Sequence, residues 1–120
     1  MQTTDKHNQR IATMSFGTVY PLYLTKITKK NRTKEELTTV IQWLTGYTEK
    51  EQENLISKNT NFETFFQNAR LHPNAHLITG VICGYRIEEI ENTLTKQVRY
   101  LDKLVDELAK GRALDKILRS

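Results

Sequence analysis

An apolar stripe of helical spacing in the last third of the chain constrains the fold more than any other feature. Its members recur three or four residues apart: Ile87, Ile90, Leu94, Val98, Leu101, Val105 and Leu108. That spacing puts them on one face of a helix. Leu104 and Ala109 make the face wider than a coiled-coil seam, which is typical of packing inside a bundle. We predict a helix that begins near Asn92 and ends at Gly111, followed by a short helix over 113–118.

Three capping boxes predict further helices in the middle of the chain. Each pairs a threonine with a glutamate three residues later, and together the two side chains satisfy free backbone amides at a helix start. The pairs are Thr33 with Glu36, Thr48 with Glu51, and Thr60 with Glu63. We therefore expect several helices separated by short turns.

The first third of the chain divides into a polar tail and a helix. Residues 1–12 lack a clear period, and we predict a mobile tail. After Ser15, an apolar helical face runs from Phe16 to Ile27, and Pro21 should kink this helix or restart it. Asn31 is suited to a left-handed helix stop.

Residues 77–85 (LITGVICGY) fit either a helix or a buried strand. We favour the helix, because a lone strand would leave its backbone groups unpaired unless a partner subunit supplied the match. The alternative is a short strand at 77–83.

These patterns together predict an all-α fold, a compact single-domain bundle of about five or six helices over 13–120. A length of 120 residues suits one domain. No apolar run approaches the ~18 residues that a membrane span needs. The single cysteine excludes an intrachain disulfide, and no signal peptide opens the sequence, so we expect a cytoplasmic protein that does not bind membranes.

The net charge of +4 raises the question of nucleic-acid binding. The loop residues Lys29, Lys30 and Arg32 are candidates for phosphate contacts. The helix pair 33–45 and 48–58 has the short turn of a helix-turn-helix. The second helix is acidic, however, whereas a recognition helix presents basic and amide side chains to DNA. We expect no sequence-specific DNA binding, and at most weak, salt-sensitive binding.

Amphipathic aromatics and arginines form the main candidate for a ligand site. Such side chains can line a polar-tipped pocket, and the candidates are Tyr20, Tyr23, Trp43, Tyr47, Arg86 and Arg99. The competing interpretation is a helical core whose hydroxyl groups bond to backbone or water at its edge.

The remaining reactive side chains give weaker signals. Cys83 lies in an apolar run, and we predict that it is buried. His72 and His76 have helical spacing, but Pro73 breaks the geometry of a metal site. We expect no metal and no cofactor, and find no phosphate loop, dinucleotide fingerprint or nucleophile elbow.

Several longer motifs carry a family resemblance. In order they are FGTVYPLY, RTKEEL, WLTGY, FETFF, LITGVICGYRIEEIE and RYLDKLVDELAKGRALDKILR. With these motifs the chain resembles, over about residues 10–119, a bacterial family of small uncharacterised proteins, domain of unknown function 2200. The resemblance implies no assigned activity and no catalytic residues.

The sequence therefore favours a non-enzymatic binding or self-association module. The alternatives are a small-molecule-binding protein or enzyme that uses the aromatic–arginine pocket, and a weak, sequence-independent nucleic-acid binder. The apolar stripe is long for the elements that could cover it. We therefore predict a homodimer with 94–118 or 77–85 in its interface. Activity and ligand identity stay open at this stage.

Overall fold

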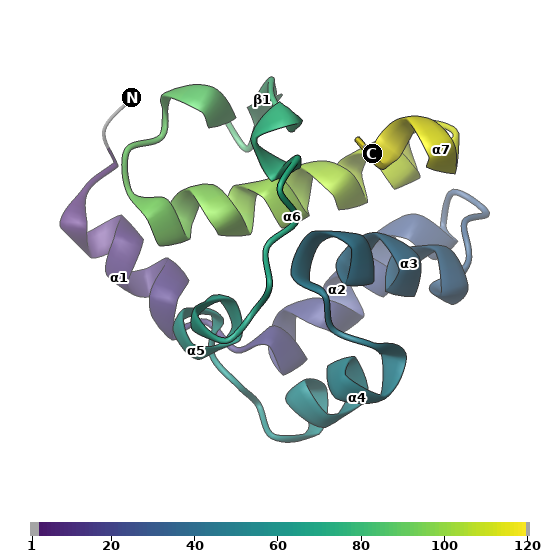
Figure 1. Ribbon diagram of the computed structural model, residues 1–120, viewed down its shortest axis with the longest axis horizontal. Helices are drawn as coiled ribbons and strands as arrows, with labels where there is room; N and C mark the ends of the chain where they lie inside the picture. Colours follow the sequence, from purple (N-terminus) through teal and green to yellow (C-terminus); the bar gives the residue numbers. More distant parts are fainter. Residues whose placement is uncertain (1–2, 120) are drawn as a thin grey trace.

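The helix that carries the apolar stripe, α6 (Thr93–Ala109), lies at the centre of the fold in the computed structural model, which describes residues 3–119 (Figure 1). Four helices pack against it: α1 (Asp5–Thr13), α2 (Phe16–Thr28), α3 (Lys34–Thr45) and α5 (Phe62–Gln67). The helix α4 (Glu49–Ser57) packs on α2 and α3, and α7 (Leu114–Ile117) folds back onto α6. The all-α prediction is confirmed.

The stripe on α6 is covered within one chain. Val98, Leu101 and Leu108 are at most 3% exposed, and Leu94, near the start of the helix, is the half-buried member. Burial of these side chains supplies most of the driving force that holds the surrounding helices. The premise that part of residues 94–118 stays uncovered is therefore wrong for the centre of the stripe.

The predicted helix starts are confirmed in two of three cases. Thr33 and Thr48 each form a full capping box with the glutamate three residues later. The third start is displaced by one residue, because the side chain of Asn61, rather than Thr60, accepts a hydrogen bond from the Thr64 amide at 2.9 Å.

The helix α2 begins and ends as predicted but is not interrupted. Ser15 caps it, and the helix continues through Pro21 to Thr28. Asn31 follows with a φ of 63°, the left-handed stop that the sequence indicated.

In the residues that the structure describes, the predicted tail contains the helix α1. Thr4 caps α1, and Ile11 is 5% exposed. The side-chain oxygen of Asn8 accepts hydrogen bonds from Thr3 and, at 2.7 Å, from Thr95 on α6. These polar contacts hold α1 without an apolar stripe, which is why periodicity did not reveal it. Residues 1–2 of the predicted tail lie outside the described residues.

The favoured helix over 77–85 is also wrong, and the alternative short strand is confirmed. A 3₁₀ turn, η1 (Ala75–Leu77), precedes the hairpin of β1 (Val81–Ile82) and β2 (Tyr85–Arg86), and a second, η2 (Ile87–Glu89), follows. Cys83 and Gly84 form the turn with φ values of 54° and 82°, and positive φ at both central residues is what a two-residue hairpin turn of type I′ requires. The strand is thus paired within its own chain, which removes the objection that its backbone would be unsatisfied.

Candidate functional site

Of the six predicted pocket residues, two lie together in the structure and the other four lie apart. Tyr23 and Arg99 both bind Asp102. The Trp43 ring stacks on His72 with centroids 4.2 Å apart. Arg86 is exposed at the hairpin, where it forms ion pairs with the adjacent glutamates.

The other two residues of that set also lie apart. Tyr20 borders a narrow cavity of about 30 Å³ between α2, α3 and α4. Tyr47 donates a hydrogen bond from its hydroxyl to the Phe65 carbonyl at 2.6 Å and lines a different pocket. The six residues do not line a common cavity.

The cluster around Asp102 joins four elements. The Tyr23 hydroxyl donates to Asp102 at 2.5 Å, and Arg99 donates to the other carboxylate oxygen at 2.8 Å. Arg99 also reaches Nε2 of His7 at 3.3 Å and lies over the Tyr85 ring, 5.3 Å from its centroid. Since these groups use one another as partners, the cluster ties α1, α2, α6 and β2 together.

Protonation states in this cluster follow from burial and charge. Burial, followed by the carboxylate of Asp102, raises the pKa of Tyr23 well above its ordinary value. Burial, followed by the charges of Arg99 and Arg10, lowers the pKa of His7. A protonated tyrosine and a neutral histidine are the forms that donate to Asp102 and accept from Arg99.

The candidates for phosphate contacts have different surroundings. Lys29 and Lys30 are exposed after α2. Arg32 instead donates to the carbonyls of Leu108 and Arg112, at 3.1 and 2.7 Å, and to Glu36 at 2.7 Å. These carbonyls lie at the C-terminal end of α6, where partial negative charge favours a cation.

Cys83 is exposed, so the prediction of a buried thiol is wrong. The hairpin explains the error, because it turns Ile82 inward, to 8% exposure, and places the next residue in the turn. An apolar run that fits a buried helix thus contains an exposed turn position.

An open groove runs along the N-terminal half of α6 and is the larger of two candidate sites. Two cavities of about 430 and 280 Å³ share Thr93 and Gln97 in their lining. Thr93, Gln97 and Tyr100 are spaced along one face of α6. The full lining is Glu63, Phe66, Gln67, Leu71, Ile90, Glu91, Thr93, Leu94, Lys96, Gln97 and Tyr100. We term this surface the α6 groove.

The α6 groove combines an apolar floor with polar side chains that have no hydrogen-bond partner among residues 3–119. Phe66, Ile90 and Tyr100 are 6%, 3% and 6% exposed and form the floor. Within residues 3–119, the side chains of Gln67, Thr93, Gln97 and Tyr100 form no hydrogen bond. Gln67, Thr93 and Gln97 were not predicted as site residues, although Thr93 and Gln97 form a polar row with Tyr100 beside the apolar stripe.

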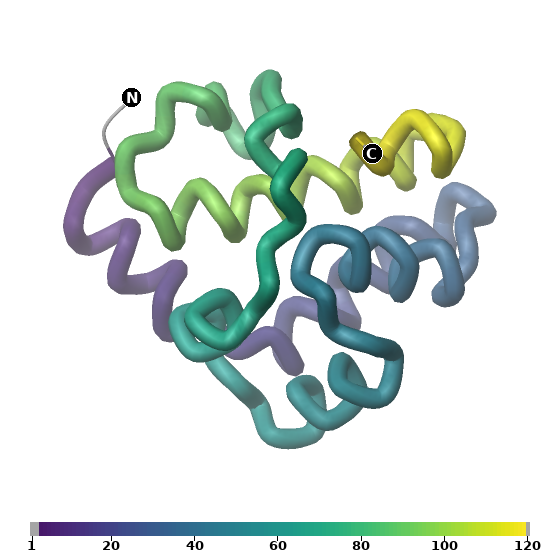
Figure 2. Tube along the Cα trace, viewed as in Figure 1, coloured from purple at the N-terminus to yellow at the C-terminus, as the bar shows by residue number. Residues whose placement is uncertain are grey.

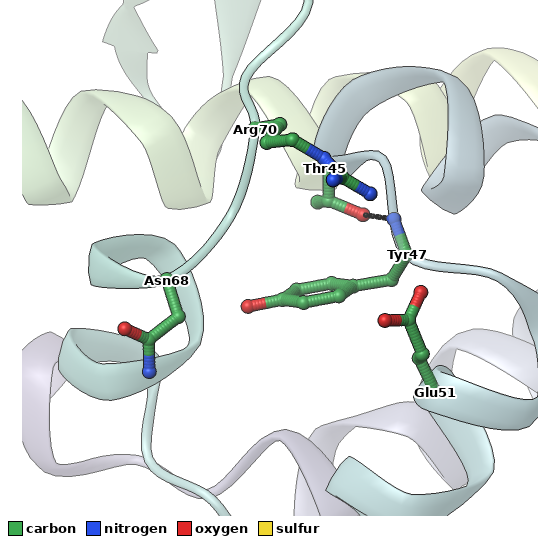
Figure 3. Close-up of a pocket in the computed structure, with 5 residues that line it drawn as sticks. All are labelled: Thr45, Tyr47, Glu51, Asn68 and Arg70. Atoms are coloured by element: carbon green, nitrogen blue, oxygen red, sulfur yellow. Dashed lines mark hydrogen bonds between the residues drawn. The ribbon is translucent and has the colours of Figure 1, made fainter.

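A second, smaller site lies around Tyr47. Its cavity of about 180 Å³ is lined by Thr45, Tyr47, Glu51, Asn68 and Arg70 (Figure 3). In this view Asn68 faces the hydroxyl end of the Tyr47 ring, Glu51 lies near its backbone end and Arg70 lies above it. We term this the Tyr47 pocket.

The segment 66–71 separates the two sites. Figure 2 shows the chain leaving α5 and crossing α6 on its way to the hairpin. Phe66, Gln67 and Leu71 line the α6 groove, whereas Asn68 and Arg70 line the Tyr47 pocket. The two sites are thus neighbours with a common wall.

The comparison with known families decides the membership of this chain. A family described as "Uncharacterized protein conserved in bacteria (DUF2200)" matches residues 10–119. The chain belongs to DUF2200. The crystal structure of the uncharacterized protein SP1917 is similar to this DUF2200 member, with a TM-score of 0.85 and 38% sequence identity over 92% of this chain and 91% of that chain. No curated protein matches the chain.

Two further features are absent from the described residues, a membrane-spanning helix and a metal-binding cluster. Among residues 3–119, no helix has both the length and the apolar character needed to cross a membrane. The same residues contain no cluster of three or more histidine, cysteine, aspartate or glutamate side chains placed to hold a metal ion.

Proposed function

We propose that this DUF2200 member is a non-enzymatic binding module whose α6 groove takes a short, extended peptide segment of a partner protein. The observation that carries the proposal is the row of unpartnered polar side chains above an apolar floor. A peptide offers both amide donors and carbonyl acceptors along its backbone. Gln97 and Gln67 can supply both kinds of partner, and Tyr100 and Thr93 add hydroxyl groups.

The shape of the α6 groove favours an extended ligand over a compact one. Thr93 and Tyr100 are seven residues apart on α6, which corresponds to roughly 10 Å of helix. Two adjoining cavities along that length match a few residues of an extended chain, with apolar side chains entering beside Phe66 and Leu94. Glu63 and Glu91 outnumber Lys96 among the charged lining residues, so a peptide that carries a basic residue is favoured.

Selection from a random peptide library tests this proposal. We expect wild-type protein to enrich peptides with apolar and basic residues, with affinities measured by fluorescence polarisation. Leu94→Asp and Gln97→Ala should each weaken binding at least about tenfold, since they remove an apolar contact and a hydrogen-bonding group. The matched control is Leu22→Asp, at a side chain 65% exposed on α2 and outside the groove. Failure to enrich any peptide, or equal binding by the groove variants, would contradict the proposal.

We propose self-association through residues 77–85 as a second function. Leu77 and Val81 are 48% and 52% exposed, and they supply two of the four large apolar side chains that are exposed in the described residues. Exposed apolar side chains that are close together favour an interface. We also propose a cytoplasmic location, on the grounds given by the sequence.

A further inference from the structure

We infer that the Tyr47 pocket binds a small zwitterion of the α-amino-acid class, with Arg70 on its carboxylate and Glu51 on its ammonium group. The site is separate from the α6 groove, and the inference does not depend on the proposed peptide-binding function.

The charge arrangement of the pocket supports this ligand class. Glu51 comes from the first turn of α4 and Arg70 from the segment after α5, so opposite charges enter from different elements. Glu51 and Arg70 form no ion pair with each other within the described part of the chain. Hydrogen bonds from Thr48 and, last among the causes, the charge of Arg70 lower the pKa of Glu51, so this side chain is an anion at neutral pH. A ligand with both charges would complete the pair.

Both charged groups are positioned but retain free binding capacity. One carboxylate oxygen of Glu51 accepts from the Thr48 amide at 2.8 Å, and among residues 3–119 the carboxylate forms no ion pair. The Arg70 backbone amide donates to the Thr45 carbonyl at 2.9 Å, whereas its guanidinium has only a 3.5 Å contact with the Gly46 carbonyl. A guanidinium has five donors in a planar fork, which matches a carboxylate.

The lack of a side chain at Gly46 lets Arg70 lie close to the backbone at the end of α3. A Cβ at residue 46 would lie 3.2 Å from Cβ and 3.3 Å from Nε of Arg70, closer than most such contacts. Gly46 also has a φ of 78°, the left-handed conformation that ends α3. Glycine at this position therefore allows both the helix end and the close contact with Arg70.

The size and remaining lining of the pocket restrict the ligand further. A volume of about 180 Å³ corresponds to roughly six water molecules at ~30 Å³ each, and it lies below the ~300 Å³ lower bound of pockets for drug-sized ligands. The Tyr47 hydroxyl and the Thr45 hydroxyl already donate to the Phe65 and Ile41 carbonyls. The side-chain amide of Asn68 forms no hydrogen bond in residues 3–119, so it is free to bind either end of the ligand.

Titration of the full chain with free amino acids, followed in ¹H–¹⁵N spectra, tests the inference. The twenty common amino acids are added individually up to about 10 mM, which detects dissociation constants in the millimolar range. We expect at least one of them to shift the amides of Gly46, Tyr47, Asn68 and Arg70. Its N-acetyl derivative and its amide, which lack the ammonium and carboxylate charges respectively, should bind at least about tenfold more weakly.

Substitutions of Arg70 and Glu51 test which side chain binds each charge of the ligand. Arg70→Gln and Glu51→Gln should each weaken binding at least about tenfold. Glutamine keeps the helix cap at residue 51, so the second variant should fold normally. The controls Glu49→Gln, in the same turn of α4, and Arg86→Gln, at the hairpin, should bind like the wild type. Leu94→Asp should also bind normally, which separates this site from the α6 groove.

Two results would overturn the inference. One is the absence of shifts at these four amides for every amino acid tested. The other is a ligand that binds equally well after loss of either of its charges, or equally well to Arg70→Gln.

Discussion

Arg32 illustrates at the scale of one residue how a surface cation becomes a structural clamp. Its guanidinium spans Glu36 on α3 and two carbonyls at the C-terminal end of α6. The hydrogen bond from Arg32, followed by that from the Thr33 backbone, lowers the pKa of Glu36 to about 2. The sequence offered Arg32 as a phosphate contact because a charge in a loop does not reveal its partner.

Replacing Glu36 should reduce stability in a pH-dependent manner. Glu36→Gln keeps the helix cap but loses a charge-assisted contact, which we expect to cost about 1–2 kcal/mol at pH 7. The carboxylate has its lowered pKa only in the folded state, so this contribution is present above the unfolded pKa of 4.5 and is lost as the pH falls towards about 2. Urea unfolding of both proteins should show a difference at pH 7 that shrinks towards pH 2. A constant difference would contradict the clamp.

Cys83 occupies a backbone conformation that suits other residues better. Its φ of 54° lies in the left-handed region, which asparagine tolerates more readily than cysteine. Cys83→Asn creates the Asn-Gly sequence preferred in this type of turn. We expect thermal unfolding to show a gain of about 0.5–1 kcal/mol, and a loss of stability would contradict the turn geometry.

At the scale of elements, the sequence predicted those whose signals are local. The stripe on α6 and the caps at Thr33 and Thr48 depend on residues close in sequence, and they were confirmed. The helix α1 escaped prediction because it is held by a polar contact between Asn8 and Thr95. Among the residues that line the candidate sites, Tyr47 alone belongs to the predicted pocket set. Both sites form only where the segment 66–71 packs beside other elements, which the sequence does not reveal.

The contact between α1 and α6 should weaken in mild acid. His7 faces Arg99 from α6, Tyr85 from β2 and Arg10 from its own helix. Folding lowers the pKa of His7, so the folded state favours the neutral ring. The contribution of His7 to the free energy of unfolding is therefore fully present above the unfolded pKa of 6.5. It falls as the pH drops below 6.5 towards the folded pKa.

Hydrogen exchange provides the measurement for this contact. Amides of α1 in the wild type should lose protection between about pH 7 and pH 5, after correction for intrinsic exchange. In His7→Gln that added loss should disappear, whereas His76→Gln, at an exposed residue, should behave like the wild type. Equal pH dependence in all three proteins would contradict the role of His7.

At the scale of the whole molecule, internal pairing uses much of the positive charge. Arg99, Arg112 and Arg119 pair with Asp102 or Glu107, and Lys26 pairs with Asp106. These pairs leave fewer cations free for phosphate than the total of 18 lysines and arginines indicates. Weak, salt-sensitive binding to nucleic acid stays a prediction.

Sedimentation analysis at tens of micromolar tests the proposed self-association. We expect the wild type to form a dimer and Val81→Lys to shift the equilibrium towards the monomer of 14.0 kDa, because a charge would enter the interface. Leu22→Lys, a substitution of equal chemistry on α2, should leave the dimer intact. A single monomeric species in the wild type would contradict the dimer.

The proposed binding surface of this protein is the α6 groove. A titration of ¹⁵N-labelled full chain with a library-selected peptide, observed at the side-chain amides of Gln67 and Gln97, tests it. We expect both resonances to shift together with the backbone amides of Thr93–Tyr100 and to saturate at one dissociation constant. Binding of the peptide with these resonances unmoved, and shifts confined to another surface, would contradict it.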